Sequence, residues 1–394
     1  MVNEKMLALG TSRSVIRELF EYGRKRAAIV GAENVFDFSL GNPSVPAPAS
    51  VNEEAIRLLR ESDPVTLHGY TSAAGDPAVK NTLAAALNRR FGMDYTGENL
   101  YCTVGAAAAL CCCLRGLCCS EDEFIVFAPY FPEYKVFIEG AGGKMALVPP
   151  EIESFQIDFD ALEKLLNPRT KAVIVNSPNN PSGVVYSAGT ITKLAALLNA
   201  KSTEYGHPIY IIADEPYREI VYDDAEVPYI PHFYKNTLVC YSWSKSLSIP
   251  GERIGYVAVP KAVDEWERVF AAIAGAGRSL GYVNASSLFQ RVAAACVNDT
   301  ADLSVYAENR RLLLDGLLSM GFTCVEPGGT FYLFPRSLEP DDIAFSERAK
   351  AHDLLLVPGS GFGAPGHVRI SYCVPTERIR RALPVFEALA RDYR

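Results

Sequence analysis

One lysine is the first candidate for chemistry. Lys245 lies in the segment YSWSKSLSIPGERIGY, where Pro250 and Gly251 interrupt any regular helix or strand. A lysine amine becomes a nucleophile toward an aldehyde when burial or a neighbouring cation lowers its pKa, and the resulting Schiff base can be exchanged for a substrate amine. Most lysines, however, are solvated surface residues. Lys245 therefore needs support from its neighbours.

Groups suited to binding a phosphate lie near Lys245 and at one other place in the chain. Ser242 and Ser244 can donate hydroxyl hydrogens, and Arg253 can hold two phosphate oxygens at once. The turn at residues 104–107 leads into an apolar helix, whose first N–H groups and dipole favour an anion. Each feature alone also fits an ordinary loop, so only their combination indicates a phosphate site.

A carboxylate ends one of the apolar strands. Asp214 closes the segment YIIAD, and a carboxylate at the mouth of such a strand is costly unless it has a partner. The protonated nitrogen of a pyridine ring would be such a partner. Tyr217 and Asn180 could both reach a phenolic oxygen on the same ring and tune its proton affinity. A helix-capping Asp and turn-forming Asn-Pro residues are the simpler alternatives.

The order of the predicted elements places these residues at one edge of a sheet. From about residue 76 to residue 260, short β-rich runs alternate with helix-like segments, which predicts an α/β region with parallel strands. The runs 172–176 and 209–213 are apolar at nearly every position, as expected for central strands covered on both faces. Ligands of open parallel sheets bind beyond the carboxyl ends of the strands, where SPNNPSG, DEPY and SWSK fall.

The flanking segments predict a second, smaller α+β region. Before the sheet we expect a helix over residues 12–31 with Ser12 as its N-cap, and then an extended segment over 40–48. After the sheet, helices around 285–320 precede several short strands and a final helix. The strands are expected at 321–325, 330–334, 354–357 and 368–371.

Length and composition fit a chain of two domains. With 394 residues, of which 49% are hydrophobic, the chain can bury a large core. We expect a small domain formed by residues 1–45 and 285–394, and a large domain of residues 46–284 that carries the candidate site. The net charge of −8 disfavours nucleic acid and anionic membranes as partners.

No segment predicts a membrane span or a secretory signal. The longest apolar run, 104–114, is well short of the ~20 residues that cross a bilayer, and charged residues interrupt the N-terminus. Five of the ten cysteines lie within 111–119, where neighbouring helical positions point apart. We interpret the cysteines as packing residues, predict no metal site, and expect a soluble protein in the reducing cytoplasm.

Seven segments occur in an order that is specific for one family. They are LGNPSVPAP, HGYTSAAGDP, APYFPEY, SPNNPSG, DEPY, SWSK followed by GERIGY, and VRISY. Over essentially its whole length the chain thereby resembles the aspartate-aminotransferase-like family of pyridoxal-phosphate enzymes, the class I and II aminotransferases of fold type I. The resemblance implies pyridoxal 5'-phosphate as the cofactor, with transfer of an amino group from an amino acid to a 2-oxo acid through an aldimine on Lys245 and pyridoxamine phosphate.

The resemblance also implies which residues contact the cofactor ring. Lys245 would carry the cofactor and move a proton. Asp214 would pair with the pyridine nitrogen, and Asn180 and Tyr217 would bind the ring oxygen. Phe131 would stack on the face of the ring.

The phosphate and the substrate would be bound by further residues that match the family pattern. The phosphate ligands would be Ser242, Ser244, Arg253, Gly105, Ala106 and Ala107. Tyr70 would reach the phosphate from the other subunit, which implies a homodimer. Arg369 would bind the substrate α-carboxylate in a bidentate pair, beside Asn180 and with room left by Gly41. The simpler alternative for Arg369 is a surface salt bridge.

The chain departs from the family pattern at a few positions. Alanines occupy 106–108, where relatives commonly have polar residues, so the phosphate would depend more on Arg253 and on main-chain N–H groups. Ser182 replaces the more frequent Thr of the Asn-Pro-Thr-Gly turn, and Glu252 precedes Arg253 where relatives often carry an aromatic residue. These changes remove no candidate catalytic group.

Other functions remain open on the same fold. The cofactor also serves β carbon–sulfur lyases and amino acid decarboxylases. A non-catalytic regulator that acts through DNA is disfavoured, because neither a helix-turn-helix segment nor a basic stripe is apparent. The substrate side chain is not defined by the sequence: Arg278 could reach a distal carboxylate across the dimer, but a surface arginine at a helix end is the simpler account.

Overall fold

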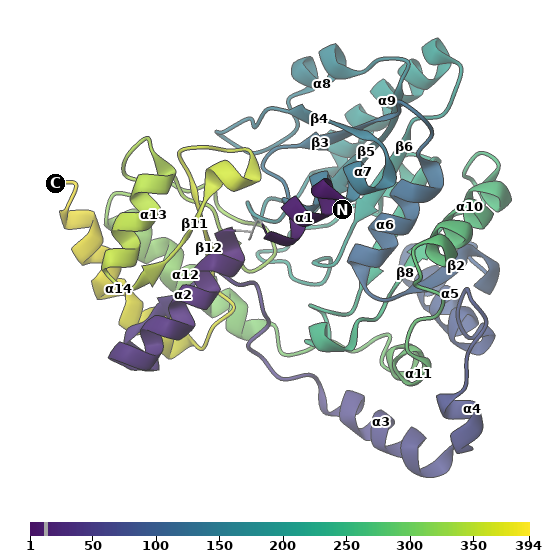
Figure 1. Cartoon of the computed structure of the whole chain (residues 1–394), viewed down its shortest axis with the longest axis horizontal. Coiled ribbons are helices and arrows are strands. Elements are labelled where there is room, and N and C mark those ends of the chain that lie inside the picture. Colours follow the sequence, from purple (N-terminus) through teal and green to yellow (C-terminus); the bar gives the residue numbers. More distant parts are fainter. Residues whose placement is uncertain (12–14) are drawn as a thin grey trace.

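A seven-stranded sheet forms the centre of the computed structural model, which describes residues 1–11 and 15–394 (Figure 1). Its strand order is β2-β8-β7-β6-β5-β3-β4. β8 is antiparallel to both of its neighbours, and the other pairs are parallel. The strands are β2 (Leu100–Thr103), β3 (Glu123–Phe127), β4 (Lys144–Val148), β5 (Thr170–Asn176), β6 (Tyr210–Asp214), β7 (Thr237–Ser242) and β8 (Gly255–Ala258). The predicted α/β region with a mostly parallel sheet is confirmed.

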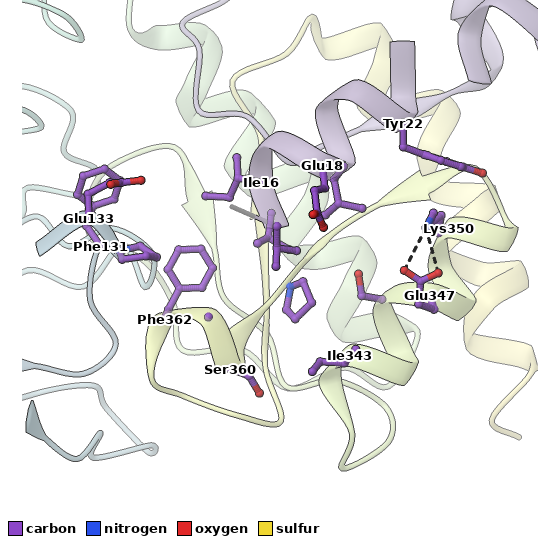
Figure 2. A pocket seen from close by; sticks show the side chains of 17 residues that line it. Ile16, Glu18, Tyr22, Phe131, Glu133, Ile343, Glu347, Lys350, Ser360 and Phe362 are labelled. Carbon is purple, nitrogen blue, oxygen red and sulfur yellow. Dashed lines mark hydrogen bonds and ion pairs between the residues drawn. The ribbon is translucent and has the colours of Figure 1, made fainter. Parts of the chain in front are cut away.

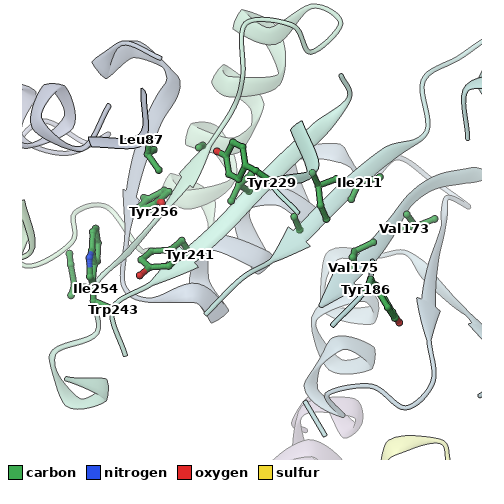
Figure 3. Packing of buried hydrophobic residues seen from close by; sticks show 14 of the residues in the cluster. Leu87, Val173, Val175, Tyr186, Ile211, Tyr229, Tyr241, Trp243, Ile254 and Tyr256 are labelled. Atoms are coloured by element: carbon green, nitrogen blue, oxygen red, sulfur yellow. The ribbon is translucent and has the colours of Figure 1, made fainter. Parts of the chain in front are cut away.

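Helices cover both faces of this sheet, so each central strand buries side chains in two cores. In β6, Ile211 and Ala213 belong to one hydrophobic cluster, and Tyr210 and Ile212 belong to another. Figure 3 shows the first cluster, in which rings such as Tyr241 pack beside the strands. Burial on both faces explains why these strands are apolar at nearly every position. The helices are α5 (Pro77–Phe91), α6 (Ala106–Leu117), α7 (Glu133–Ala141), α8 (Phe159–Leu165), α9 (Ala188–Tyr205) and α10 (Trp266–Ser279).

A second group of elements is built mainly from the C-terminal part of the chain. A three-stranded antiparallel sheet, β11-β12-β9, packs with helices around a separate hydrophobic cluster. β1 (Phe36–Asp37) pairs in parallel with β10 (Leu354–Leu355), so an N-terminal segment joins this part. The other elements are β9 (Tyr332–Leu333), β11 (Val357–Pro358), β12 (Val368–Ser371), α12 (Ser304–Ser319), α13 (Asp342–Ala351) and α14 (Thr376–Arg391). In Figure 1 they lie together at the left.

Five further α-helices belong to the described part of the chain, beside several short 3-10 helices. They are α1 (Glu4–Thr11), α2 (Val15–Val30), α3 (Ala49–Glu61), α4 (Pro64–His68) and α11 (Ser287–Ala295). α2 lies beside β11, and Arg26 of α2 is paired with Asp353 (2.6 Å). α11 packs against α3, α4 and α5. The division into domains at residues 45 and 285 stays a prediction.

Three expectations about secondary structure differ from the structure. The helix expected over 12–31 is α2, Val15–Val30, and its expected N-cap, Ser12, lies outside the described residues. The strand expected at 321–325 is wrong: the chain there is irregular after Gly321, whose φ of 97° reverses it at the end of α12. The strand expected at 354–357 is two strands, because Leu354–Leu355 pairs with β1 and Val357–Pro358 with β12. None of the described helices is long and apolar enough to cross a membrane.

Candidate active site

A cavity of about 530 Å³ opens where β5, β6 and β7 end. This edge of the sheet is the one predicted to bind a ligand. Most of the candidate residues line the cavity, although they come from distant parts of the sequence. They are Gly41, Ala106, Ala107, Phe131, Asn180, Asp214, Tyr217, Ser242, Ser244, Lys245, Arg253 and Arg369. Gly105 and Tyr70 are not among the lining residues.

Lys245 lies just beyond β7 with its amine in the cavity. Its Nζ donates a hydrogen bond to the carbonyl oxygen of Gly41 (2.7 Å). Burial lowers the pKa of the Lys245 ammonium to about 8, and the guanidinium groups of Arg369 and Arg253 act in the same direction. Near neutral pH a fraction of this amine is therefore uncharged and nucleophilic.

Asp214, the last residue of β6, presents one carboxylate oxygen that is buried and unpaired. The residue is 5% exposed. Its Oδ2 accepts a hydrogen bond from the Tyr134 hydroxyl (2.5 Å), whereas Oδ1 has no partner within residues 1–11 and 15–394. Burial raises the pKa of the Asp214 carboxyl to about 7. A cationic group placed against Oδ1 would give this oxygen a partner and would offset the free-energy cost of burying the charge.

The groups predicted to bind a phosphate converge on the start of α6. Ser242 donates a hydroxyl hydrogen to Ser244 (3.1 Å). Arg253 has a left-handed backbone (φ 53°), and its guanidinium lies so close to Gly105 that a Cβ on this glycine would come within 2.7 Å of Nη2. Gly105, with φ 89°, precedes Ala106, the first residue of the helix. Hydroxyls, a guanidinium and the N–H groups of a helix start are thus brought to one cavity.

Arg369, in β12, is a buried residue and not a surface salt bridge. It is 2% exposed, and its guanidinium lies over the rings of Tyr332 (4.7 Å) and Phe362 (4.9 Å). Nη1 donates to Asn180 Oδ1 (3.0 Å) and Nη2 to the Ser39 carbonyl (2.5 Å). Nε has no partner in the described part of the chain. A charged group held this rigidly is suited to binding a carboxylate.

Gly41 and Tyr217 meet at a shared neighbour, Tyr332. The hydroxyls of Tyr217 and Tyr332 are hydrogen-bonded to each other (3.0 Å). A Cβ on Gly41 would lie 1.9 Å from the Tyr332 hydroxyl, so only glycine fits while this tyrosine keeps its place. The space beside Gly41 that a larger side chain would fill is therefore occupied by the hydroxyl of Tyr332.

Three aromatic or charged candidates have different surroundings. Phe131 lines the cavity and packs edge-on against Tyr134, with ring centroids 5.6 Å apart. Tyr70 is 97% exposed, and its side chain does not line the cavity of its own chain. Arg278 is exposed in the last turn of α10. In a single chain, only Phe131 of these three lies at the candidate site.

Several residues of the site were not predicted from the sequence. Tyr134 and Asn176 contact Asp214, and Tyr332 contacts both Tyr217 and Arg369. Asn176 ends the apolar strand β5, so its position at a carboxyl end was a usable signal. α2 also supplies lining residues, namely Ile16, Arg17 and Phe20. Their helix precedes the sheet in the sequence, and no pattern there indicated that it covers the cavity.

A second cavity of about 450 Å³ adjoins the first (Figure 2). The two share Ile16, Phe131 and Glu133 as lining residues. Figure 2 shows Ile16 of α2 facing Phe131 and Phe362, with Lys350 and Glu347 of α13 at the other end. Phe362 also contacts Arg369, so the second cavity extends from the neighbourhood of Arg369 toward α13.

Six of the ten cysteines are packed in the interior, and the other four are partly or fully exposed. All ten are free, and Cys102, Cys112, Cys113, Cys240, Cys296 and Cys373 are buried. Burial raises the pKa of the Cys112 and Cys240 thiols, which keeps them protonated. No group of three or more His, Cys, Asp or Glu side chains suited to a metal ion is found among the residues described.

Comparison with known proteins identifies the family. The sequence model of the family "Aminotransferase class I and II" matches residues 33–386. The chain belongs to this family. An aspartate aminotransferase of Thermotoga maritima is 31% identical over 92% of this chain and 93% of its own length, and an aspartate/prephenate aminotransferase of Thermus thermophilus is 31% identical over 88% of each. The crystal structure of an amino transferase from Eubacterium rectale matches 100% of this chain and 99% of its own with a TM-score of 0.98 and 56% identity.

These relatives decide between the functions left open by the sequence. The chain is an aminotransferase, and its fold is that of the aspartate aminotransferases. The relatives are named as aminotransferases, so a β carbon–sulfur lyase, a decarboxylase and a non-catalytic regulator are not favoured.

Proposed function

We propose that this aminotransferase uses pyridoxal 5'-phosphate bound at Lys245 to move an amino group from an amino acid to a 2-oxo acid. One observation carries the proposal. A single cavity contains an amine whose pKa is lowered to about 8 and a buried carboxylate oxygen without a partner, on Lys245 and Asp214. Opposite shifts in two groups of one cavity are typical of a built functional site.

The residues present fit this cofactor. Asp214 Oδ1 would hold the protonated pyridine nitrogen, and Asn180 and Tyr217 the ring oxygen. Phe131 would cover one face of the ring. The phosphate would be held by Ser242, Ser244, Arg253 and the N–H groups of Gly105, Ala106 and Ala107. When bound, the cofactor supplies a ring that accepts the electron pair left when the substrate loses its Cα proton.

Side chains of the protein would bind the substrate, take its Cα proton and exclude water. Arg369 would bind the substrate α-carboxylate, and its contacts with Asn180 and the Ser39 carbonyl fix its direction. Lys245 Nζ would take the proton from the substrate Cα, since its lowered pKa leaves part of the amine uncharged near neutral pH. Ile16 and Phe20 of α2 line the cavity and would exclude water from the base.

We also propose a cytoplasmic homodimer that serves amino acid metabolism, including biosynthesis. The exposed position of Tyr70 supports a second subunit, because the family role of this tyrosine lies in the neighbouring site. Exposed apolar side chains precede Tyr70 in the sequence, and others precede Asn284, which donates a hydrogen bond to the carbonyl oxygen of Thr71 (2.8 Å). They are Ile56, Leu59, Val65, Leu280 and Val283.

The decisive experiment is a half-reaction. Protein incubated with pyridoxal phosphate should absorb in the near-visible range, and aspartate without an acceptor should abolish this absorption and yield about one pyridoxamine phosphate per subunit. Lys245→Ala should show neither event, whereas Lys193→Ala, at an exposed position on α9, should behave as the wild type. Unchanged turnover in Lys245→Ala would refute the proposal. Pyruvate and ammonia from a β-substituted substrate would instead identify a lyase.

The same half-reaction ranks the amino donors. The names of the relatives make aspartate the first donor to test, with glutamate, alanine and phenylalanine beside it. If Arg278 binds a distal carboxylate across the dimer, Arg278→Ala should lose the preference for aspartate and glutamate over alanine. An undiminished preference for acidic donors would refute that role.

A further inference from the structure

We propose that Tyr134 is a positioning residue that fixes the Asp214 carboxylate, leaving one of its oxygens for the ring nitrogen of the cofactor. This inference rests on the proposed function and extends it by one residue. The contact joins two parts of the chain that are far apart in sequence, α7 and the end of β6.

The contacts around Asp214 are one-sided. Tyr134 is 1% exposed, and its hydroxyl donates to Oδ2 (2.5 Å). Asn176 Nδ2 donates to the main-chain oxygen of Asp214 (2.9 Å) and lies 3.5 Å from the same Oδ2. All side-chain contacts of the carboxylate thus fall on one oxygen, and Oδ1 is left without a partner in the described residues. A carboxylate tied on one side has a single orientation in which to present its other oxygen.

Charge explains why a neutral hydroxyl is needed at this place. Burial raises the pKa of the Asp214 carboxyl, the carboxylate of Glu215 adds to the effect, and the hydrogen bond from Tyr134 opposes both. The pKa of the Tyr134 hydroxyl is itself raised well above its usual value by burial and by Asp214. Tyr134 therefore stays protonated, so it can only donate to the carboxylate and helps to keep it ionised.

The same short segment also carries a second residue of the site. Phe131, proposed to cover the ring face, packs edge-on against Tyr134 (5.6 Å, 86°) at the start of α7. The start of α7 thereby positions both the ring of Phe131 and the carboxylate of Asp214. A change at Tyr134 that preserves the aromatic ring leaves this packing intact and removes only the hydroxyl.

The test compares two ligands for the same apoprotein. Tyr134→Phe is titrated with pyridoxal phosphate and with 1-deazapyridoxal phosphate, in which a carbon replaces the ring nitrogen. We expect the variant to bind pyridoxal phosphate about tenfold more weakly than the wild type, because the carboxylate loses a charge-assisted hydrogen bond. It should bind the deaza analogue as well as the wild type does, since this ligand makes no ion pair with Asp214. Tyr130→Phe, from the same segment and with no side-chain hydrogen bond in the described chain, is the matched control.

The outcomes separate three cases. A loss confined to pyridoxal phosphate supports the inference. Equal losses for both ligands would mean that Tyr134 acts through packing or folding, and no loss for either would mean that Asp214 needs no such donor; both results overturn it. A wild-type protein that fails to bind pyridoxal phosphate refutes the proposed function itself, which is a different result.

Discussion

At the scale of single residues, burial acts in opposite directions on the two titratable groups of the cavity. It lowers the pKa of the Lys245 ammonium and raises that of the Asp214 carboxyl, and the two values come to about 8 and about 7. In water the same groups would lie more than six units apart. The cavity therefore brings the pKa values of both groups close to neutral pH.

The raised pKa of Asp214 predicts that the free energy of unfolding of the apoprotein depends on pH. The unfolded carboxyl loses its proton near pH 4, whereas the folded one keeps it up to about pH 7. Stability must therefore fall as pH rises through this window. Asp214→Asn, which removes the titration, should stabilise the apoprotein by a few kcal/mol at about pH 8 and by less at about pH 5.

Urea unfolding at both pH values measures this difference. Asp160→Asn, at an exposed position in the first turn of α8, is the control and should show little change. A difference between wild type and Asp214→Asn that does not vary with pH would contradict the prediction.

Several of the residues that the sequence predicted end or follow strands, or open a helix. Asp214, Ser242 and Asn180 could be placed at one sheet edge from the order of elements alone. Tyr134 and Tyr332 could not, because each acts through a contact with a residue about 80 or more positions away. Such contacts depend on how the elements pack, and local pattern does not contain that information.

At the scale of elements, the turn between β2 and α6 forms the end of the cavity at which we propose that the phosphate binds. Gly105 has a positive φ and touches Arg253. Gly92, at the end of α5, also has a positive φ (62°) but has nothing within 4 Å of the position of a Cβ. Gly92 therefore serves as a control glycine of positive φ that has no side chain beside it.

Alanine at these two glycines should have different effects on the cofactor. Gly92→Ala should lose about 1 kcal/mol of stability from its left-handed backbone (φ 62°, ψ 28°), and Gly105→Ala should lose more, because φ 89° with ψ 175° is almost restricted to glycine. Only Gly105→Ala displaces the guanidinium of Arg253, so only it should weaken the binding of pyridoxal phosphate, by roughly tenfold. Fluorescence titration of the two apoproteins measures this, and equal affinities would count against Arg253 as a phosphate ligand.

The sequence predicted best those strands that are buried on both faces, and it predicted less well the segments that bury few side chains. The central strands β5 and β6 are recognisable because residues 172–175 and 210–213 are all apolar. α1 has no buried residue, so no hydrophobic period marks it. Residues 321–325 resembled a strand through Phe322 and Val325, but no neighbouring strand is hydrogen-bonded to them in a ladder.

At the scale of the whole molecule, the proposed dimer predicts that two inactive variants can restore each other. If Tyr70 serves the neighbouring site, a mixed dimer of Tyr70→Ala and Lys245→Ala subunits contains one site with both residues intact. Mixing the two variants after partial unfolding and refolding should then recover activity. Recovery is measured in the half-reaction against each variant refolded alone, and none should appear if Tyr70 acts within its own subunit.

The pairing of β1 with β10 has a consequence for synthesis on the ribosome. The hydrogen-bonded strands of the seven-stranded sheet end at Ala258, so all of them are synthesised before the C-terminal third of the chain. Phe36 must wait for Leu354, and Arg369 emerges later still. A nascent chain would thus contain Lys245 and Asp214, which we propose to hold pyridoxal phosphate, well before it contains Arg369, which we propose to bind the substrate carboxylate.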